Sequence, residues 1–181
     1  MKQEIRIIGG LYRGKKIHFP TVEGLRPTPD RVKETLFNWL MHDIHDARCL
    51  DAFAGSGSLG FEAFSRGAAQ VVFLEQAPAA YNNLQKIIKQ FNSPKLKLIK
   101  TDTTNYLQRC TEQFDLIFLD PPFAVNLIPQ CLTAITKNHL LVKGGLVYLE
   151  APTLIDVDPE QWKSIKLKQN GQVIYSLFEK L

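Results

Sequence analysis

The stretch Asp51-Ala52-Phe53-Ala54-Gly55-Ser56-Gly57-Ser58-Leu59-Gly60 decides the fold of this chain. It follows the apolar pair Cys49-Leu50 and contains the spacing G-x-G-x-x-G. Glycines at these positions allow a tight turn and let a ligand approach the backbone closely. A helical pattern follows over residues 57–66, so the sequence predicts a strand, a glycine loop and a helix. This arrangement is typical of sites that bind a nucleoside-type cofactor.

An acidic residue, Glu75, stands 20 positions after Gly55 at the end of the next apolar run. Residues 71–75 predict a buried strand, which places the Glu75 carboxylate at the edge of the sheet beside the glycine loop. A carboxylate there can accept hydrogen bonds from both hydroxyls of a ribose. Taken alone, the pattern also fits NAD. A dehydrogenase, however, normally needs a substrate domain, for which 181 residues leave no room.

The chain continues as an alternation of strands and helices. Strands are expected at residues 96–99, 114–119 and 145–150, and helices at 78–91, 103–110 and 126–138. Residues 163–169 and 172–179 flank Asn170-Gly171, which is a strong hairpin signal. The sequence therefore predicts an α/β, Rossmann-like fold with a mostly parallel sheet and a C-terminal antiparallel hairpin.

The N-terminal segment has a different pattern. Residues 4–8 and 14–19 predict a small β-hairpin, and residues 29–41 predict an amphipathic helix with Thr28 as its N-cap and Pro29 as its first residue. We expect one domain over residues 1–181, with residues 1–25 as a basic hairpin extension and residues 26–181 as the catalytic core. The hairpin is expected to be exposed and to contribute little to the main core.

A second motif, Asp120-Pro121-Pro122-Phe123, follows the strand expected at residues 114–119. An ionised aspartate offers only hydrogen-bond acceptors, and the main chain of Pro121 offers only a carbonyl. Two adjacent acceptors match the two N–H bonds of an exocyclic amino group, and Phe123 offers a face for stacking a base. The motif therefore predicts a site for the amino group of a nucleobase.

The chemistry of such an amine explains why acceptors are useful. Its lone pair is delocalised into the ring, so it is a poor nucleophile. Accepting hydrogen bonds from both N–H groups localises the lone pair, and a carboxylate stabilises the positive charge that develops on the nitrogen. Together, the two motifs predict transfer of a methyl group from S-adenosylmethionine to a base nitrogen.

Positive charge is concentrated at the N-terminus. The net charge is +4, yet residues 1–33 alone hold eight basic and three acidic side chains, and the remainder holds 14 basic and 15 acidic ones. Such an excess marks either a solvated arm or a phosphate-binding surface. We predict that Arg6, Arg13, Lys15 and Lys16 bind RNA.

Three cysteines without a CxxC pair argue against a disulfide framework and a zinc site, and no metal is expected. No apolar run resembles a signal peptide or a membrane span. We therefore expect a cytoplasmic protein that does not bind membranes, and we expect it to be a monomer.

The motifs together resemble those of class I S-adenosylmethionine-dependent methyltransferases. The N-terminal segments Arg6-Ile7-Ile8-Gly9-Gly10-Leu11-Tyr12-Arg13-Gly14 and Arg26-Pro27-Thr28-Pro29-Asp30-Arg31-Val32-Lys33-Glu34-Thr35-Leu36-Phe37-Asn38 narrow the resemblance to the 16S rRNA (guanine-966-N2)-methyltransferase family. The resemblance covers essentially the whole chain. It implies methylation of a guanine N2 in the 16S rRNA of the small ribosomal subunit.

The resemblance also implies roles for individual residues. Asp120, Pro121, Pro122 and Phe123 would hold the base. Glu75 would bind the ribose hydroxyls, and Asp102 would accept a hydrogen bond from the adenine amino group. The remaining residues expected around S-adenosylmethionine are Thr28, Arg31, Asp51, Phe53, Ala54, Gly55, Gly57 and Thr103.

Alternatives remain open at this point. The motif at Asp120 does not separate guanine from adenine, so an adenine-N6 methyltransferase acting on DNA or RNA is the nearest rival. A protein-glutamine methyltransferase poses the same chemical problem, but the basic N-terminus disfavours it. A non-catalytic RNA-binding module with a vestigial cofactor fold is disfavoured by the intact Asp120.

Overall fold

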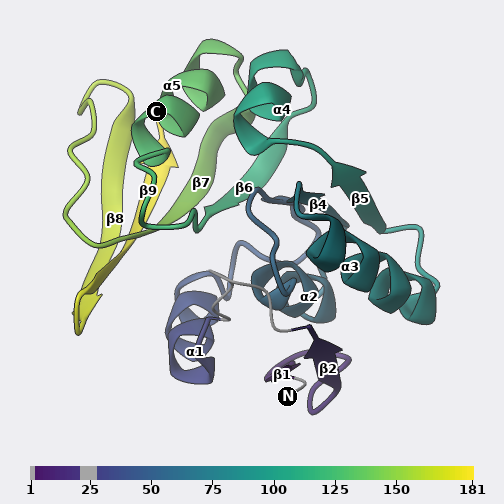
Figure 1. Cartoon of the computed structure of the whole chain (residues 1–181). Helices are drawn as coiled ribbons and strands as arrows, with labels where there is room; N and C mark the ends of the chain where they lie inside the picture. Colours follow the sequence, from purple (N-terminus) through teal and green to yellow (C-terminus); the bar gives the residue numbers. More distant parts are fainter. Residues whose placement is uncertain (1–2, 21–27) are drawn as a thin grey trace.

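The computed structural model describes residues 3–20 and 28–181 and contains two β-sheets and five helices within those residues (Figure 1). The strands are β1 (Gln3–Arg6), β2 (Lys16–Phe19), β3 (Arg48–Asp51), β4 (Gln70–Glu75), β5 (Leu96–Lys100), β6 (Phe114–Leu119), β7 (Leu141–Ala151), β8 (Trp162–Asn170) and β9 (Val173–Lys180). The helices are α1 (Asp30–Trp39), α2 (Ser58–Ser65), α3 (Pro78–Phe91), α4 (Thr103–Arg109) and α5 (Ile128–Lys137).

The main sheet has seven strands in the order β5-β4-β3-β6-β7-β9-β8. The first five of these are parallel, and β9 and β8 extend the sheet as an antiparallel hairpin. The chain moves outward in one direction from β3 to β5 and in the other from β6 onward. Ligands bind at such a reversal, outside the carboxyl ends of the strands. The predicted fold is confirmed, and its reversal lies between β3 and β6.

Helices cover both faces of the sheet, and each face has its own apolar core (Figure 1). One core lies under α1, α2 and α3 and includes Cys49, Phe61 and Phe118. The other lies under α4 and α5 and includes Cys131 and Ile117. Adjacent residues of a strand point to opposite faces, so Ile117 and Phe118 of β6 serve different cores. This explains why β4 and β6 are almost continuously apolar.

The N-terminal hairpin packs against the body of the protein, and the expectation of an exposed, weakly attached hairpin was wrong. Ile5 and Ile17 belong to the same core as α1–α3. Tyr12, in the loop between β1 and β2, stacks on Phe64 of α2 with a centroid distance of 5.2 Å. A Cβ on Gly10 would lie 1.9 Å from the backbone oxygen of Ser65, so this close approach requires glycine.

A buried carboxylate anchors the same hairpin. Glu62 of α2 has no exposed surface, and its Oε2 accepts a hydrogen bond from the backbone N–H of Ile8 at 2.9 Å. Its Oε1 accepts one from Arg66 Nε at 2.8 Å. The polar sequence of the segment concealed this attachment because its buried apolar residues stand at alternate positions of the two strands, between polar ones.

The element boundaries lie within two residues of the predictions, except at the start of β7. Helix α1 begins at Asp30 with Pro29 as its N-cap, and Thr28 makes no capping bond but is buried. Strand β7 begins at Leu141, four residues earlier than expected, because it continues through Gly144-Gly145 with a register shift opposite Phe114 and Leu116. The expected boundary between residues 25 and 26 lies outside the described residues.

Within residues 3–20 and 28–181, none of the helices has the length and apolar character needed to cross a membrane. The same residues contain no cluster of three or more histidine, cysteine, aspartate or glutamate side chains arranged to hold a metal ion.

Candidate active site

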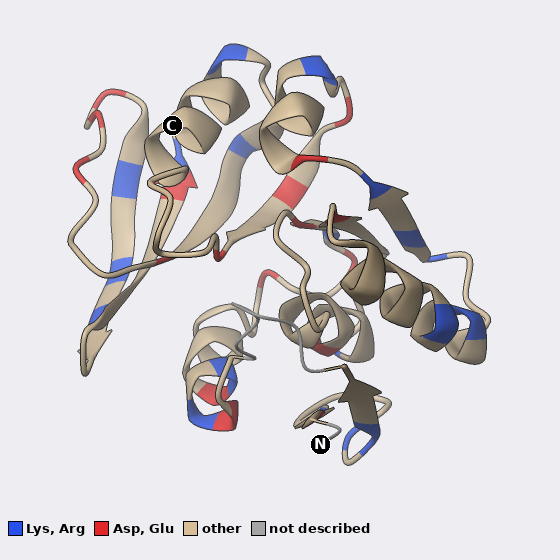
Figure 2. Ribbon diagram, viewed as in Figure 1, with Lys and Arg blue, Asp and Glu red and all other residues tan. Residues whose placement is uncertain are grey.

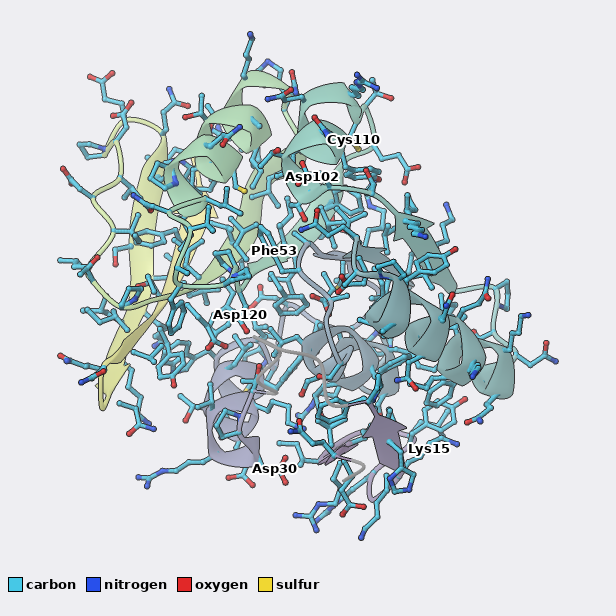
Figure 3. The ribbon with its side chains drawn as sticks, viewed as in Figure 1. Lys15, Asp30, Phe53, Asp102, Cys110 and Asp120 are labelled. Carbon is cyan, nitrogen blue, oxygen red and sulfur yellow. The ribbon has the colours of Figure 1, made fainter. Side chains whose placement is uncertain are left out.

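The carboxyl ends of β3, β4 and β6 open onto a pocket of about 650 Å³. Figure 3 labels Phe53, Asp102 and Asp120, which come from three separate loops around it. Most residues predicted to contact the cofactor or the base line this pocket: Thr28, Asp51, Phe53, Ala54, Gly55, Glu75, Asp102, Thr103, Asp120, Pro121, Pro122 and Phe123. A pocket of this size suits a nucleoside-type ligand together with part of a second molecule.

The glycines of the loop have separate structural tasks. Gly55 and Gly57 both adopt the left-handed conformation, with φ values of 53° and 79°. A Cβ on Gly57 would lie 2.4 Å from the ring of Phe61, and a Cβ on Gly60 would lie 2.2 Å from the ring of Phe73. Gly57 is therefore required by the turn and by the packing of α2. It does not line the pocket, so the geometry does not support its predicted contact with the cofactor.

Asp51 stabilises the glycine loop through a buried hydrogen bond. Its side chain is only 3% exposed, and its Oδ2 accepts a hydrogen bond from the backbone N–H of Gly60 at 2.9 Å. Burial raises the pKa of Asp51 to about 7, with further contributions from the charges of Asp120 and Glu75, while the Gly60 bond acts in the opposite direction. Asp51 thus fixes the start of α2 relative to β3.

Glu75 is held by the two loops beside it. Its Oε2 accepts a hydrogen bond from the N–H of Gly55 at 2.9 Å, and its Oε1 accepts one from Ala77 at 2.7 Å. A carboxylate offers about four lone-pair sites, so two acceptor sites remain for a ligand. The side chain lies at the pocket, where those sites can meet hydroxyl donors.

Asp102 caps the first turn of α4. Its Oδ1 accepts hydrogen bonds from the backbone N–H of Asn105 at 2.9 Å and from the Thr104 hydroxyl at 2.6 Å. These bonds, the Thr104 hydroxyl first, lower the pKa of Asp102 and keep it ionised. Its other oxygen remains an acceptor at the pocket. The hydroxyl of Thr103 donates to the backbone oxygen of Ala52 and so ties this loop to the end of β3.

Ser58 is a pocket residue that the sequence reasoning missed. It is the first residue of α2, lines the pocket and is 5% exposed. Its Oγ is the buried side-chain polar atom without a hydrogen-bond partner in the described part of the chain. A buried hydroxyl without a partner is costly, so this group is suited to bonding with a ligand. The signal was available as a small polar residue directly after the second glycine.

Asp120 comes directly after β6 and is half-buried in the pocket. Burial first, and then the charge of Glu150, hold its pKa well above the ordinary value. Pro121 is buried beside it, whereas the Phe123 and Val125 side chains are 46% and 52% exposed. Apolar side chains left open at the mouth of a pocket are suited to contact a flat ligand.

Glu150 is a second residue that sequence reasoning passed over. It lies near the carboxyl end of β7, is 5% exposed, and accepts a hydrogen bond from the Tyr148 hydroxyl at 3.0 Å. Burial raises its pKa to about 7, although the Tyr148 bond acts against this. The signal was an acidic residue ending an apolar strand, as at Asp51, Glu75 and Asp120.

Five other predicted residues lie away from this pocket. Arg31 lines a separate pocket between α1 and the C-terminal hairpin, so its predicted place beside the cofactor is not supported by the geometry. Arg6 pairs with Asp30 at 3.3 Å, and Lys16 pairs with Glu4 at 3.0 Å. The remaining two are Lys15, whose Nζ lies 4.8 Å from the centroid of Phe91, and the exposed Arg13.

The chain is similar to proteins named as methyltransferases. The family model described as Conserved hypothetical protein 95 matches residues 5–179. "Ribosomal RNA small subunit methyltransferase D" of Haemophilus influenzae is 45% identical, over 98% of this chain and 95% of its own length. The protein of the same name from Escherichia coli is 38% identical, over 98% and 90%.

A solved structure from Escherichia coli, named "Putative methyltransferase yhhF", superimposes with a TM-score of 0.91. It is 38% identical to this chain, and the superposition covers 98% of each chain. The family resemblance seen in the sequence is therefore confirmed. The chain belongs to the Conserved hypothetical protein 95 family, which its match over residues 5–179 establishes.

Proposed function

We propose that this enzyme transfers a methyl group from S-adenosylmethionine to the exocyclic N2 of a guanine in 16S rRNA of the small ribosomal subunit. The observation that carries the proposal is the position of Asp120 and Pro121 in the same pocket as Glu75 and Asp102. One side of the pocket offers acceptors for a nucleoside and the other offers acceptors for an amino group. The relatives named ribosomal RNA small subunit methyltransferase D supply the substrate class.

The residues at the pocket fit S-adenosylmethionine. Glu75 retains two acceptor sites for the ribose hydroxyls, and the second oxygen of Asp102 is available to the adenine amino group. Phe53 and Leu74 provide apolar surface between them for the adenine ring. The unpartnered hydroxyl of Ser58, at the start of α2, suits the carboxylate of the methionine part. When bound, S-adenosylmethionine would supply an electrophilic methyl group.

Asp120 and Pro121 would hold the target base. The carboxylate of Asp120 and the carbonyl of Pro121 accept the two N–H bonds of N2, which localises the nitrogen lone pair and orients it for in-line attack. Phe123, which is exposed at the mouth, would stack on the base extruded from the RNA.

Charge on Asp120 matters most in the transition state. Positive charge develops on N2 as the new C–N bond forms, and the nearby carboxylate stabilises it. Once the methyl carbon has left sulfur, N2 must lose one proton. The Asp120 carboxylate, which accepts an N–H bond of N2 in this arrangement, is positioned to accept that proton.

An rRNA substrate would place the reaction in the cytoplasm, where ribosomal subunits are assembled, and we propose that the protein acts there as a monomer. Each of the motifs needed for the chemistry is contributed by the single chain.

The test is to incubate the protein with labelled S-adenosylmethionine and undermethylated small subunits, free rRNA or DNA, and then to identify the methylated nucleoside. We expect N2-methylguanosine from the small subunit. The variant Asp120→Ala should lower kcat by about a thousand-fold or more, a loss of about 4 kcal/mol or more of transition-state stabilisation, and change cofactor affinity only a few-fold. N6-methyladenosine as the product, or near-normal turnover by the variant, would contradict the proposal.

A further inference from the structure

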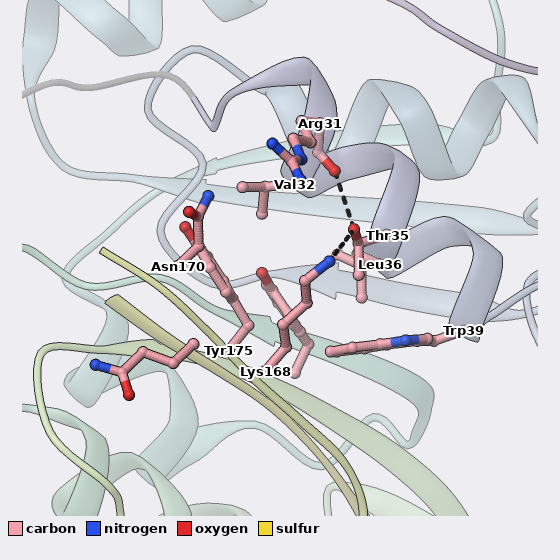
Figure 4. A pocket seen from close by; sticks show the side chains of 10 residues that line it. Arg31, Val32, Thr35, Leu36, Trp39, Lys168, Asn170 and Tyr175 are labelled. Carbon is pink, nitrogen blue, oxygen red and sulfur yellow. Dashed lines mark hydrogen bonds between the residues drawn. The ribbon is translucent and has the colours of Figure 1, made fainter. Parts of the chain in front are cut away.

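A second pocket lies between α1 and the C-terminal hairpin β8–β9 (Figure 4). Its volume is about 110 Å³, and it shares no lining residue with the pocket around Asp120. Its lining includes Arg31, Thr35, Trp39, Tyr148, Lys168 and Tyr175. Apolar residues of α1 form part of it, and polar groups of β8 form its rim.

The lining of this pocket is positively charged. It contains two cations, Arg31 and Lys168, and no carboxylate. Lys168 Nζ donates to Thr35 Oγ1 at 3.3 Å, and Thr35 in turn donates to the backbone oxygen of Arg31 at 3.1 Å (Figure 4). In the part of the chain that the structure describes, neither cation takes part in an ion pair. Both charges are therefore available to an anionic group.

A third cation extends this charged surface along the edge strand. Lys166 is exposed, and it lies two residues before Lys168 on β8. Its cross-strand partner is Leu177, whereas the partner of Lys168 is Tyr175. Cross-strand partners share a face of the sheet, and Tyr175 and Leu177 both belong to the core beneath α1. Lys166 and Lys168 therefore face the same side as α1.

Aromatic side chains stand beside these charges. Trp39 is the last residue of α1, is partly exposed and lines the pocket together with Tyr175. The combination of cations with an accessible aromatic face is what a single nucleic acid strand requires, since phosphates need charge and bases need a surface for stacking. The amides of Gln169 and Asn170 add donors and acceptors at the rim.

The pocket is close to the reacting end of β6. Tyr148 of β7 lines it and pairs in register with Phe118, two residues before Asp120. Tyr175 pairs in register with Glu150. Burial and then Glu150 are the main causes of the raised pKa values of Tyr148 and Tyr175. The charge of Asp120 raises both pKa values further. Helix α1 connects the two pockets, because Thr28 just before it lines one and Arg31 lines the other.

We propose that this second pocket and the surface of β8 beside it bind a nucleotide of the RNA strand adjoining the methylated base, with Arg31, Lys166 and Lys168 at the phosphates on either side of it and Trp39 against its base. The inference rests on the proposed rRNA methylation and specifies where the strand runs beyond the target. It assigns a substrate-binding role to the C-terminal hairpin, for which the sequence indicated none.

The test compares the double variant Lys166→Ala/Lys168→Ala with a control that removes the same charge elsewhere. Lys137 is exposed at the end of α5, on the other face of the sheet from α1, and Lys143 is exposed near the amino end of β7; neither lines the pocket, so Lys137→Ala/Lys143→Ala is that control. Binding to a short single-stranded RNA and to undermethylated small subunits is measured over a range of salt concentrations. Methylation kinetics and S-adenosylmethionine affinity are measured in parallel.

For Lys166→Ala/Lys168→Ala we expect about a ten-fold higher KM for the subunit, little change in kcat, and a salt slope reduced by about 1.4, which corresponds to two phosphate contacts on a single strand. Affinity for S-adenosylmethionine should not change. The control should resemble wild type. Equal behaviour of the two double variants would overturn this inference while leaving the methylation proposal intact.

A separate variant tests the stacking surface. Trp39→Leu keeps an apolar side chain at the end of α1 and removes the aromatic face. It should weaken RNA binding several-fold without changing the salt slope, because no phosphate contact is lost. Unchanged RNA affinity in a folded variant would remove Trp39 from the site. A wild-type protein that binds RNA with this pattern but methylates no rRNA would instead contradict the proposed function.

Discussion

Both hairpins carry lysine and arginine residues (Figure 2), and they differ in how these charges are paired. In the N-terminal hairpin, Arg6 and Lys16 pair with Asp30 and Glu4. In the C-terminal hairpin, Lys163 pairs with Glu179 at 3.9 Å, whereas Lys166 and Lys168 form no ion pair within the described residues. Each hairpin has four cations, and two of them in the N-terminal hairpin but only one in the C-terminal hairpin have a carboxylate partner within residues 3–20 and 28–181.

Their attachment to the body differs as well. The N-terminal hairpin forms its own small sheet and is held by side-chain contacts and by the backbone hydrogen bond that the Leu11 N–H donates to Ser65 O, whereas β8 and β9 are hydrogen-bonded into the main sheet. Each hairpin also lies near a buried carboxylate. Glu62 has Arg66 as an ionic partner, while the hydrogen-bond donor to Glu150 is a tyrosine hydroxyl. These differences can be measured.

The largest difference should appear in stability. Ile17 in β2 is 3% exposed, so Ile17→Ala should lower the free energy of unfolding by about 2–5 kcal/mol. Leu167 in β8 is 55% exposed, so Leu167→Ala should change it by about 0.5 kcal/mol or less. Urea denaturation of both variants measures this. Similar losses of stability in the two variants would show that Ile17 contributes no more than an exposed residue of an edge strand. That result would contradict the packing of the N-terminal hairpin against the core.

The ionic anchor under the N-terminal hairpin should have the next largest effect. Glu62→Gln leaves one acceptor for the Ile8 N–H but removes the charge that faces Arg66. We expect a loss of about 1–3 kcal/mol in the free energy of unfolding. The exposed residue Glu160 provides the control, since Glu160→Gln should have almost no effect. Equal stabilities of the two variants would contradict this role of Glu62.

The carboxylate beside the C-terminal hairpin should instead produce a pH dependence. The pKa of Glu150 is about 7 in the folded protein and 4.5 ordinarily, so the folded state holds a proton that the unfolded state releases. Stability should therefore fall as the pH rises from 4.5 to 7. Glu150→Gln should be more stable than wild type at pH 8 by about 1–3 kcal/mol, and the difference should vanish near pH 4.

Part of the dependence of stability on pH should remain in that variant, because burial also raises the pKa of Asp51, to about 7, and that of Asp120, and both shifts act in the same direction. Urea titrations between pH 4 and 8 test this in the ligand-free protein. Parallel curves for wild type and Glu150→Gln would show that Glu150 is ionised at neutral pH in the fold.

The smallest effect concerns the N-terminal cations. Replacing Arg6, Arg13, Lys15 and Lys16 with alanine should reduce the salt slope of RNA binding by less than the roughly 2.8 that four single-strand phosphate contacts would give. Two of the four cations already have acidic partners. A reduction near 2.8 would show that RNA displaces both ion pairs and that the N-terminal hairpin is the main RNA surface.

The sequence predicted much of this architecture because its signals are local. The apolar runs at β4 and β6, the glycine loop and Asn170-Gly171 each specify an element within a few residues, and the structure has those elements. The acidic residues at strand ends were found where a known motif drew attention to them. Glu150 has the same local pattern and was passed over because no motif surrounds it.

What the sequence could not predict depends on contacts between distant segments. The attachment of the N-terminal hairpin needs Ile8 beside Glu62, 54 residues apart. The pocket at Trp39 needs Lys168 beside Thr35, 133 residues apart. Counting charges along the chain likewise cannot show which ones are neutralised by a neighbour in space.

The two buried cysteines lie in different layers, Cys49 under α1–α3 and Cys131 under α4 and α5. Burial raises the pKa of both thiols, that of Cys131 to about 12, so almost no thiolate exists in the native protein at neutral pH. An alkylating reagent can then modify either one only when its layer opens. In a variant with the partly exposed Cys110 replaced by serine, only Cys49 and Cys131 can react. Their two modification rates would then measure separately how often each side of the sheet opens.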